Sequence, residues 1–365
     1  MTVISADGHI DMGFIPDDIF KENAPAALKE RVPTITARRP ALPAAASLDP
    51  NFQRTSPSYY RMAEAGLYQD VEKGIFRPGT PELRAKDQEL DGLSGEVIYG
   101  VLGLNGRLKD DPEALRACLR IYAEWVADFK NKVPGRFAPL TPLSGADPEW
   151  DAEDFRYAAK LGLGGIELRP ETAVKPFWDK MWEPVWDAAE ETGLPVHFHS
   201  NIGNLMRAMG EPDEENRKTY NALIGSMGKM INAQYLGTII LSGVLERHPK
   251  MTLVMGECDV SWIPHFLNRM DYMVSEREHG TGLPKLPSEY WFRQCRATFQ
   301  SDKLGMDMVK YLGEDNIMWG NDYPHPDGVW PISQDVIKET MSGLSEETRK
   351  KITHDNVAKL YGFNN

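Results

Sequence analysis

Three short stretches of this chain place Asp and His at the ends of strand-like sequence. They are "SADGHID" (5–11), "VHFHSN" (196–201) and "GNDYPH" (320–325). Carboxylate oxygens and imidazole nitrogens are the ligands that zinc, manganese and iron take in proteins. We therefore predict one divalent metal, held by Asp7, His9, His197 and Asp322.

Further oxygen and nitrogen donors stand close to these stretches and could hold a second metal. They are His199, Glu257 and His325. Glu257 could equally act as a base in proton transfer, or as a hydrogen-bonded group behind the ligands. A pair of residues two apart on a strand faces the same side, so His197 and His199 should point the same way.

Other polar and aromatic residues near these strand ends could contact a substrate. Arg169 could hold a substrate carboxylate through two parallel hydrogen bonds, or could form a structural salt bridge. Trp262, Trp319 and Tyr323 could line an aromatic pocket together with His325, although aromatic residues beside strand ends also serve as plain core.

The elements that must position these residues follow a βα pattern. Short apolar runs bounded by Gly, Pro and Asn alternate with segments of helical periodicity. The predicted strands are 2–10, 95–101, 137–144, 164–170, 194–200, 251–259, 295–301 and 316–325, and the clearest predicted helices are 111–132 and 176–193. Eight such units predict a (β/α)8 TIM barrel, in which strand C-termini share one face and strand eight neighbours strand one.

One segment interrupts the alternation. Residues 16–86 are rich in proline and contain "PALPAAASLDP" between the first and second predicted strands. A loop of this length usually serves as a lid or a binding element. We expect a single domain spanning residues 1–365, with 16–86 as a lid-like insertion over the barrel mouth.

Composition limits the partners and the compartment. The 365 residues carry a formal charge of −13 and no long basic run, so nucleic acid and anionic membranes are poor partners. The three cysteines are far apart and odd in number, which fits neither a disulfide framework nor a CxxC metal site. With no apparent signal sequence or membrane-spanning stretch, we expect a cytoplasmic protein that acts on a small molecule.

Several motifs together resemble the amidohydrolase superfamily, in the branch that contains aminocarboxymuconate semialdehyde decarboxylase. They are "ADGHID", "RAKDQELDGLSGEVIYG", "FKNKVPGRFAPLTPLS", "GVLERHPKMTLVMGECDVSWIPHFLNRMD", "WGNDYPHPDG" and "ITHDNVAKLYGF". The resemblance implies a metal-dependent barrel enzyme that forms dimers or larger homo-oligomers. Two positions depart from the decarboxylases of this branch. The first motif is Asp-x-His, and Glu257 stands where those enzymes carry a histidine on strand six.

The leading functional hypothesis is hydrolysis of a small cyclic or aromatic substrate at an amide, ester, lactone or C–C bond. Asp322 would accept a proton from metal-activated water, and His199 or Arg169 would stabilise the oxyanion. The alternative is non-oxidative decarboxylation of an aromatic or muconate-like acid, with Asp322 or Glu257 protonating carbon. A non-haem iron oxygenase and a barrel that only binds its ligand are further alternatives.

Overall fold

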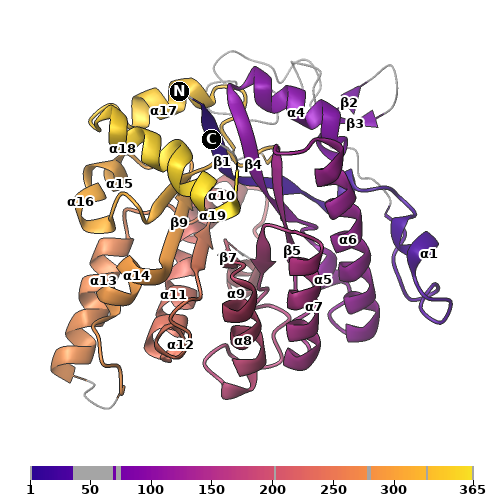
Figure 1. The fold of residues 1–365 in the computed structure, drawn as a ribbon, viewed down its shortest axis with the longest axis horizontal. Helices are drawn as coiled ribbons and strands as arrows, with labels where there is room; N and C mark the ends of the chain where they lie inside the picture. The colour runs from indigo at the N-terminus through magenta and orange to yellow at the C-terminus, as the bar shows by residue number, and fades with distance from the viewer. Residues whose placement is uncertain are drawn as a thin grey trace.

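The structure is a computed structural model that describes residues 2–35, 69–70, 75–200, 203–277, 281–325 and 328–363. Eight parallel strands form one continuous sheet in the order in which they occur along the chain (Figure 1). They are β1 (Val3–Ile10), β4 (Leu93–Gly100), β5 (Phe137–Pro142), β6 (Gly165–Glu167), β7 (Val196–His199), β8 (Leu253–Gly256), β9 (Cys295–Phe299) and β10 (Ile317–Trp319). Each predicted strand overlaps one of them, so the predicted TIM barrel is confirmed.

The sheet closes where β10 meets β1. The Tyr323 carbonyl accepts a hydrogen bond from the His9 N–H at 2.7 Å, and the Asp322 N–H donates to the Asp7 carbonyl at 2.8 Å. A Cβ at Gly320 would lie 2.4 Å from the Asp7 Cβ, so the close approach of the two chains at this seam requires glycine. The seam brings residues that are more than 300 positions apart in sequence into direct contact.

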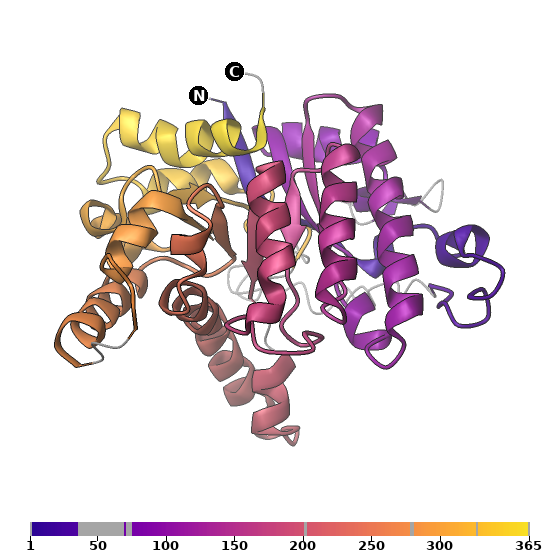
Figure 2. The ribbon, with the colours of Figure 1, turned by 60° about the horizontal axis from the view of Figure 1, so that its bottom comes forward.

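Helices surround the barrel between successive strands (Figures 1 and 2). The longer ones are α4 (Pro81–Leu90), α6 (Pro112–Lys132), α7 (Pro148–Lys160), α8 (Glu183–Thr192), α10 (Arg217–Gly228), α11 (Asn232–Leu241), α13 (Ile263–Tyr272), α14 (Pro287–Gln294) and α17 (Ser333–Thr340). Shorter ones are α1 (Ile19–Asn23), α5 (Leu104–Arg107), α9 (Gly203–Met209), α12 (Val244–Arg247), α15 (Lys303–Asp307), α16 (Val309–Leu312), α18 (Glu346–Lys350) and α19 (Asn356–Tyr361). None of the helices in the described ranges is long and apolar enough to cross a membrane.

The predicted helix boundaries are partly confirmed. Asp111 caps α6 by accepting a hydrogen bond from the Ala114 N–H, as its position before a proline indicates. The helix predicted to begin at Pro176 instead starts at Glu183, after a single 3₁₀ turn, η4 (Lys180–Trp182). The side chain of Phe177 is buried in the core beside β7, which holds residues 176–179 in an irregular turn.

Two apolar cores stabilise the barrel. The larger lies between the sheet and the surrounding helices, and all three cysteines are buried there without a disulfide. The smaller fills the interior of the barrel and includes Ile4, Val97, Leu140 and Val254. Val357 of α19 belongs to this inner core, so the C-terminal helix packs against the interior of the barrel.

The described residues of the predicted 16–86 insertion divide into three parts, one of which is the short antiparallel pair β2 (Gln69–Asp70) and β3 (Ile75–Phe76) followed by a 3₁₀ turn, η3 (Arg77–Gly79). Residues 16–35 run past α1 to the start of α6, where Arg31 forms ion pairs with Asp111 and Glu113. Residues 81–86 belong to α4, the regular helix between the first two barrel strands. Most of the remaining insertion lies outside the described residues, and its placement over the barrel mouth stays a prediction.

A buried ion pair attaches α4 to the seam of the barrel. The Arg84 guanidinium donates to both carboxylate oxygens of Glu96 on β4 at 2.7 Å, and neither side chain is exposed. The same guanidinium donates to the backbone carbonyl of His9 at 2.8 Å and to that of Tyr323 at 3.3 Å. A single side chain of α4 therefore holds β4, β1 and the segment after β10 together.

We expect Arg84→Met to lower the free energy of unfolding by about 3–5 kcal/mol, because it leaves the Glu96 carboxylate buried without its partner. Urea denaturation of the full chain measures this loss. The matched control is Arg156→Met, since Arg156 pairs with Glu191 at the surface; a change there of about 0–1 kcal/mol is expected. Equal losses in the two variants would contradict the assignment of Arg84 as the residue that holds the seam.

Candidate metal centre

Backbone strain is concentrated where the barrel strands end. Val101, Glu257, Asp259 and Asp322 have positive φ angles of 48°, 49°, 48° and 55°. Each follows the C-terminal end of β4, β8 or β10. Residues other than glycine adopt this left-handed backbone conformation at a cost in conformational energy. Such residues cluster at functional sites. The strain therefore marks the face on which a TIM barrel carries its active site.

Four predicted site residues converge at this face. The Nε2 atom of His9 lies 3.4 Å from the Asp7 Oδ1 atom and 3.1 Å from the Asp322 Oδ1 atom. The Nε2 atom of His199 lies 3.4 Å from the same Asp7 oxygen. All four side chains are at least nine-tenths buried. Strands β1 and β7 and the segment after β10 thus bring two imidazoles and two carboxylates into one group.

The hydrogen bonding of this group indicates a site for a cation. Among the described residues, His9 Nε2 and both carboxylate oxygens of Asp322 are buried and make no hydrogen bond of good geometry, although His9 and His325 nitrogens lie 3.1 and 3.0 Å from Asp322 Oδ1. Buried polar atoms are normally paired, because an unpaired one loses its hydration without compensation. A divalent cation between these atoms would satisfy the imidazole lone pair and the carboxylate charge together. The residues present therefore fit a bound metal ion.

The electrostatics of the group also favour a cation. Burial alone would raise the pKa of Asp322, but His325 and His9 hold it well below its ordinary value. Burial and His325 lower the pKa of His9, yet the Asp322 and Asp7 carboxylates raise it to about 9. Protons on His9 and His325 would then balance the carboxylates. A divalent cation could replace those protons, since metal binding requires neutral imidazole.

His197, a predicted metal ligand, lies outside this group. Its Nδ1 atom is 2.8 Å from the Tyr99 hydroxyl, and its Nε2 atom is 3.4 Å from the Tyr361 hydroxyl. Burial lowers the pKa of His197 to about 3, so the ring is neutral. His197 and His199 face the same side of β7, as predicted from their spacing. The two residues are nevertheless about 7 Å apart along the strand, and His199, at the end of the strand, is the one that reaches the group.

His325 joins the group through Asp322. Its Nδ1 atom lies 3.0 Å from Asp322 Oδ1, and its Nε2 atom lies 3.1 Å from Asp11 Oδ2. Its ring stacks on that of His9, with centroids 3.8 Å apart and planes 21° apart. His325 therefore supports Asp322 in this geometry. Nitrogen and oxygen atoms of His9, Asp11 and His325 also lie within 4.8 Å of one another, and the predicted second-metal role of His325 stays a prediction. Asp11 was not predicted from the sequence.

Glu257 lies on the far side of His199 from Asp7. Its Oε2 atom is 3.6 Å from His199 Nδ1, and its Oε1 atom is 2.6 Å from the Nζ atom of Lys229. Burial and the Asp322 carboxylate raise the pKa of Glu257, while Lys229 and His199 oppose them. Among the three predicted roles, the geometry favours the hydrogen-bonded group behind a ligand. Lys229 comes from η5 (Lys229–Ile231), and no sequence signal distinguishes it from other helical lysines.

Arg169 lies at the end of β6, as predicted, but already has an acidic partner. Its Nη2 group donates to the Glu167 Oε2 atom at 2.9 Å and to the Gly100 carbonyl at 3.1 Å. The Nε atom of Arg169 is buried without a hydrogen-bond partner among the described residues, so donor capacity remains. Burial raises the pKa of Glu167, with Arg169 acting against it. Both predicted roles, substrate contact and salt bridge, are compatible with this geometry.

The aromatic candidates are occupied in structural contacts. Tyr323 is fully buried and its hydroxyl donates to Asp87 at 2.8 Å. The indole N–H of Trp319 donates to the Gln300 carbonyl, and that of Trp262 to the Cys258 carbonyl. These contacts agree with the alternative prediction that the three aromatic residues belong to the core, because the polar atom of each side chain already has a partner within the protein.

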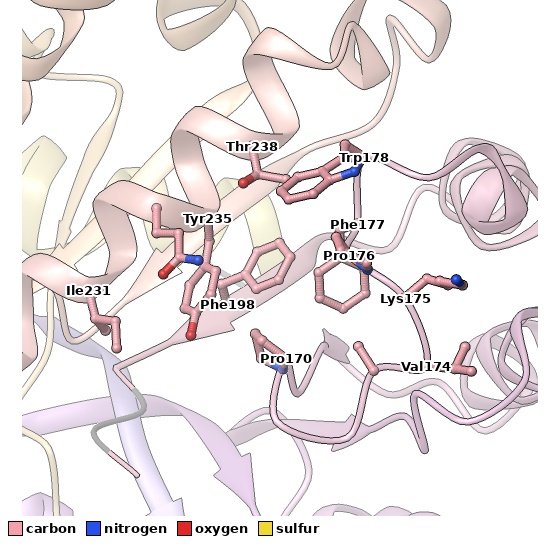
Figure 3. A pocket seen from close by; sticks show the side chains of 12 residues that line it. Pro170, Val174, Lys175, Pro176, Phe177, Trp178, Phe198, Ile231, Tyr235 and Thr238 are labelled. Atoms are coloured by element: carbon pink, nitrogen blue, oxygen red, sulfur yellow. The ribbon is translucent and has the colours of Figure 1, made fainter. Parts of the chain in front are cut away.

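A cavity of about 310 Å³ lies outside the barrel wall, behind β7 (Figure 3). Phe198 forms part of its lining, and because it lies between His197 and His199 its side chain leaves the opposite face of the strand. Its ring packs against Tyr235 and Phe177, with centroids 5.1 and 5.3 Å apart. The strand therefore separates this cavity from the group of ligands.

Comparison with known proteins finds similarity to amidohydrolases and to decarboxylases. A family model described as amidohydrolase matches residues 99–363. A 2-amino-3-carboxymuconate-6-semialdehyde decarboxylase of Dictyostelium discoideum is 21% identical over 306 residues, covering 83% of this chain and 81% of that protein. An amidohydrolase structure from Mycobacterium avium subsp. paratuberculosis aligns with a TM-score of 0.76 and 20% identity, covering 99% of both chains.

A second solved structure contains manganese and an aromatic acid. The 5-carboxyvanillate decarboxylase of Novosphingobium aromaticivorans, complexed with manganese and 4-hydroxy-3-methoxy-5-nitrobenzoic acid, aligns with a TM-score of 0.66 and 18% identity. The alignment covers 99% of this chain and 96% of that one. At this identity, the similarity establishes the shared fold.

We expect His199→Ala and Asp322→Ala each to abolish retention of a divalent metal, because each removes one donor from the group. Elemental analysis of the purified full chain, exposed to manganese and then desalted, measures this. The matched control is His265→Ala, since His265 lies at the surface. Wild-type metal content in either site variant would show that the ion binds elsewhere.

Gly256→Ala tests the geometry without removing a donor. A Cβ at Gly256 would lie 2.6 Å from both the His199 ring and the Tyr99 hydroxyl, so the imidazole must move. We expect the affinity for Mn²⁺ to fall about 10-fold or more, measured by titration calorimetry. Gly106→Ala is the control, because its Cβ would meet no atom within 4 Å. Unchanged affinity in Gly256→Ala would contradict the position of His199 as a ligand.

Proposed function

The chain belongs to the amidohydrolase family, and on that premise we propose that it is a metal-dependent decarboxylase of an aromatic carboxylic acid. The observation that carries this proposal is the buried group of Asp7, His9, His199 and Asp322 at the C-terminal ends of the barrel strands. Similarity to a carboxymuconate semialdehyde decarboxylase and a carboxyvanillate decarboxylase supports the reaction class.

The proposed metal ligands are these four residues, with His199 in the place predicted for His197. Manganese is the first choice, because the similar carboxyvanillate decarboxylase contains it, and zinc or iron would accept the same donors. The bound ion would supply Lewis acidity toward the carboxylate and the neighbouring oxygen of a substrate. The proposed roles of Glu257 and His325 are to hold His199 and Asp322 in place.

Asp322 is the proposed proton carrier. Its neighbours keep it ionised, so the proton that it delivers must arrive with the substrate, from an acidic hydroxyl group. Asp322 would pass this proton to the ring carbon that bears the carboxylate. The bond from that carbon to the carboxylate then breaks, carbon dioxide leaves, and the electron pair returns to the ring. Arg169, with its unpaired Nε–H, is the proposed contact for a second anionic group of the substrate.

The comparisons favour decarboxylation over the hydrolysis expected first from the sequence. Both reactions can use the same metal ligands and Asp322. The similar proteins whose names specify a reaction are decarboxylases. Hydrolysis stays the second candidate, because Glu257 occupies the position where decarboxylases of this branch carry a histidine. A two-iron oxygenase has less support, since Glu257 pairs with Lys229 and His325 stacks on His9. The predicted homodimer and cytoplasmic location stay predictions.

The test is product analysis on the manganese-loaded full chain. We expect hydroxylated benzoic acids, 5-carboxyvanillate among them, to release carbon dioxide and the decarboxylated phenol in equal amounts, measured by mass spectrometry and liquid chromatography. Asp322→Asn should lower the rate by at least about 100-fold, because the amide of asparagine cannot accept and deliver the proton. Turnover of lactones, esters or amides without any release of carbon dioxide would replace decarboxylation by hydrolysis.

A further inference from the structure

We propose that a buried column of three side chains, Tyr361, His197 and Tyr99, positions the two imidazoles of the metal site. The inference rests on the metal site of the proposed function, and it does not depend on the substrate. It assigns a positioning role to His197 and identifies Tyr99 and Tyr361 as part of the site.

The column connects three elements that are distant in sequence. Tyr361 is the last residue of α19, His197 lies on β7 and Tyr99 lies on β4. The hydroxyl of Tyr99 is 2.8 Å from Nδ1 of His197, and the hydroxyl of Tyr361 is 3.4 Å from Nε2. Tyr99 and His197 have no exposed surface. Both nitrogens of His197 are thereby engaged inside the barrel.

The chemistry of the three groups is complementary. A neutral imidazole carries one N–H donor and one acceptor nitrogen, and each tyrosine hydroxyl can donate or accept. One hydroxyl therefore donates to His197 while the other accepts from it. The hydrogen bonds fix the position of the Tyr99 hydroxyl, and with it the place of the Tyr99 ring between its neighbours.

The Tyr99 end of the column contacts the proposed ligands. The ring centroid of Tyr99 lies 5.6 Å from that of His9, with planes 27° apart, and 4.5 Å from that of His199, with planes 55° apart. One aromatic ring of β4 thus packs against imidazoles that come from β1 and β7. Metal ligands need a fixed orientation, and the groups behind them supply it.

The contacts also explain why Gly256 is a glycine. A Cβ there would lie 2.6 Å from the Tyr99 hydroxyl as well as from the His199 ring. The backbone of β8 therefore approaches both the column and a ligand at the same point. At its other end, Tyr361 of the C-terminal helix α19 contacts His197, which lies beneath the metal site.

The test compares Mn²⁺ affinity in His197→Leu and His197→Gln. Leucine removes both hydrogen bonds, and we expect the affinity to fall about 10-fold. The glutamine amide can still donate to one hydroxyl and accept from the other, so an affinity within about twofold of the wild type is expected. Tyr99→Phe, which keeps the ring and removes its hydroxyl, should weaken binding as His197→Leu does. Titration calorimetry on the full chain measures each value.

The control is Tyr122→Phe, because Tyr122 is fully buried and its hydroxyl has no hydrogen-bond partner among the described residues. Its affinity should equal that of the wild type. The visible spectrum of the Co²⁺-loaded protein provides a second measurement. The band positions of His197→Leu should match those of the wild type, because the coordinating atoms are unchanged.

Two results would overturn the proposal. Strongly weakened binding in both His197 variants, with a shifted Co²⁺ spectrum at saturating metal, would show that His197 is itself a ligand. Wild-type affinity in His197→Leu and Tyr99→Phe would show that the column has no positioning role. Should His197→Leu fail to fold, Tyr99→Phe decides between these results. A wild type that binds Mn²⁺ without releasing carbon dioxide would overturn the proposed reaction and leave the column standing.

Discussion

Closure of the parallel sheet between β1 and β10 is the constraint on which the site depends. Hydrogen bonds across this seam join the backbone of Asp7 and His9 to that of Asp322 and Tyr323. Without them, the carboxylate of Asp322 would have no reason to lie 3.1 Å from the imidazole of His9. Because all strands are parallel, closure also places every strand C-terminus on one face, where side chains from both ends of the chain can share a cation.

The seam is stabilised by buried charge as well as by the sheet. Arg84 holds the backbone on both sides of it, and the Glu96 carboxylate balances the guanidinium. This arrangement makes the geometry of the site depend on α4, because its Arg84 side chain binds the backbone carbonyl of His9. Asp322 adopts the left-handed conformation, with a φ of 55°, where the chain turns at the seam. This conformation costs conformational energy.

The site is organised in layers along the barrel axis. At the rim lie the proposed ligands, supported at their outer edges by Glu257 and His325. Beneath them, Tyr99 and His197 fill the interior, and Tyr361 closes the column from below. Apolar side chains occupy the rest of the barrel. Each of these polar side chains thus contacts a polar partner or could bind a cation.

The sequence by itself determined the barrel, the strand ends and the types of donor. Alternating apolar runs and helices, and Asp or His at three strand ends, are local patterns. Tertiary structure alone decided which of His197 and His199 reaches the rim, because both face inward and only depth along the strand separates them. It also decided the partners Lys229, Glu167 and Asp11, since pairing across the barrel depends on closure, which no local pattern of residues records.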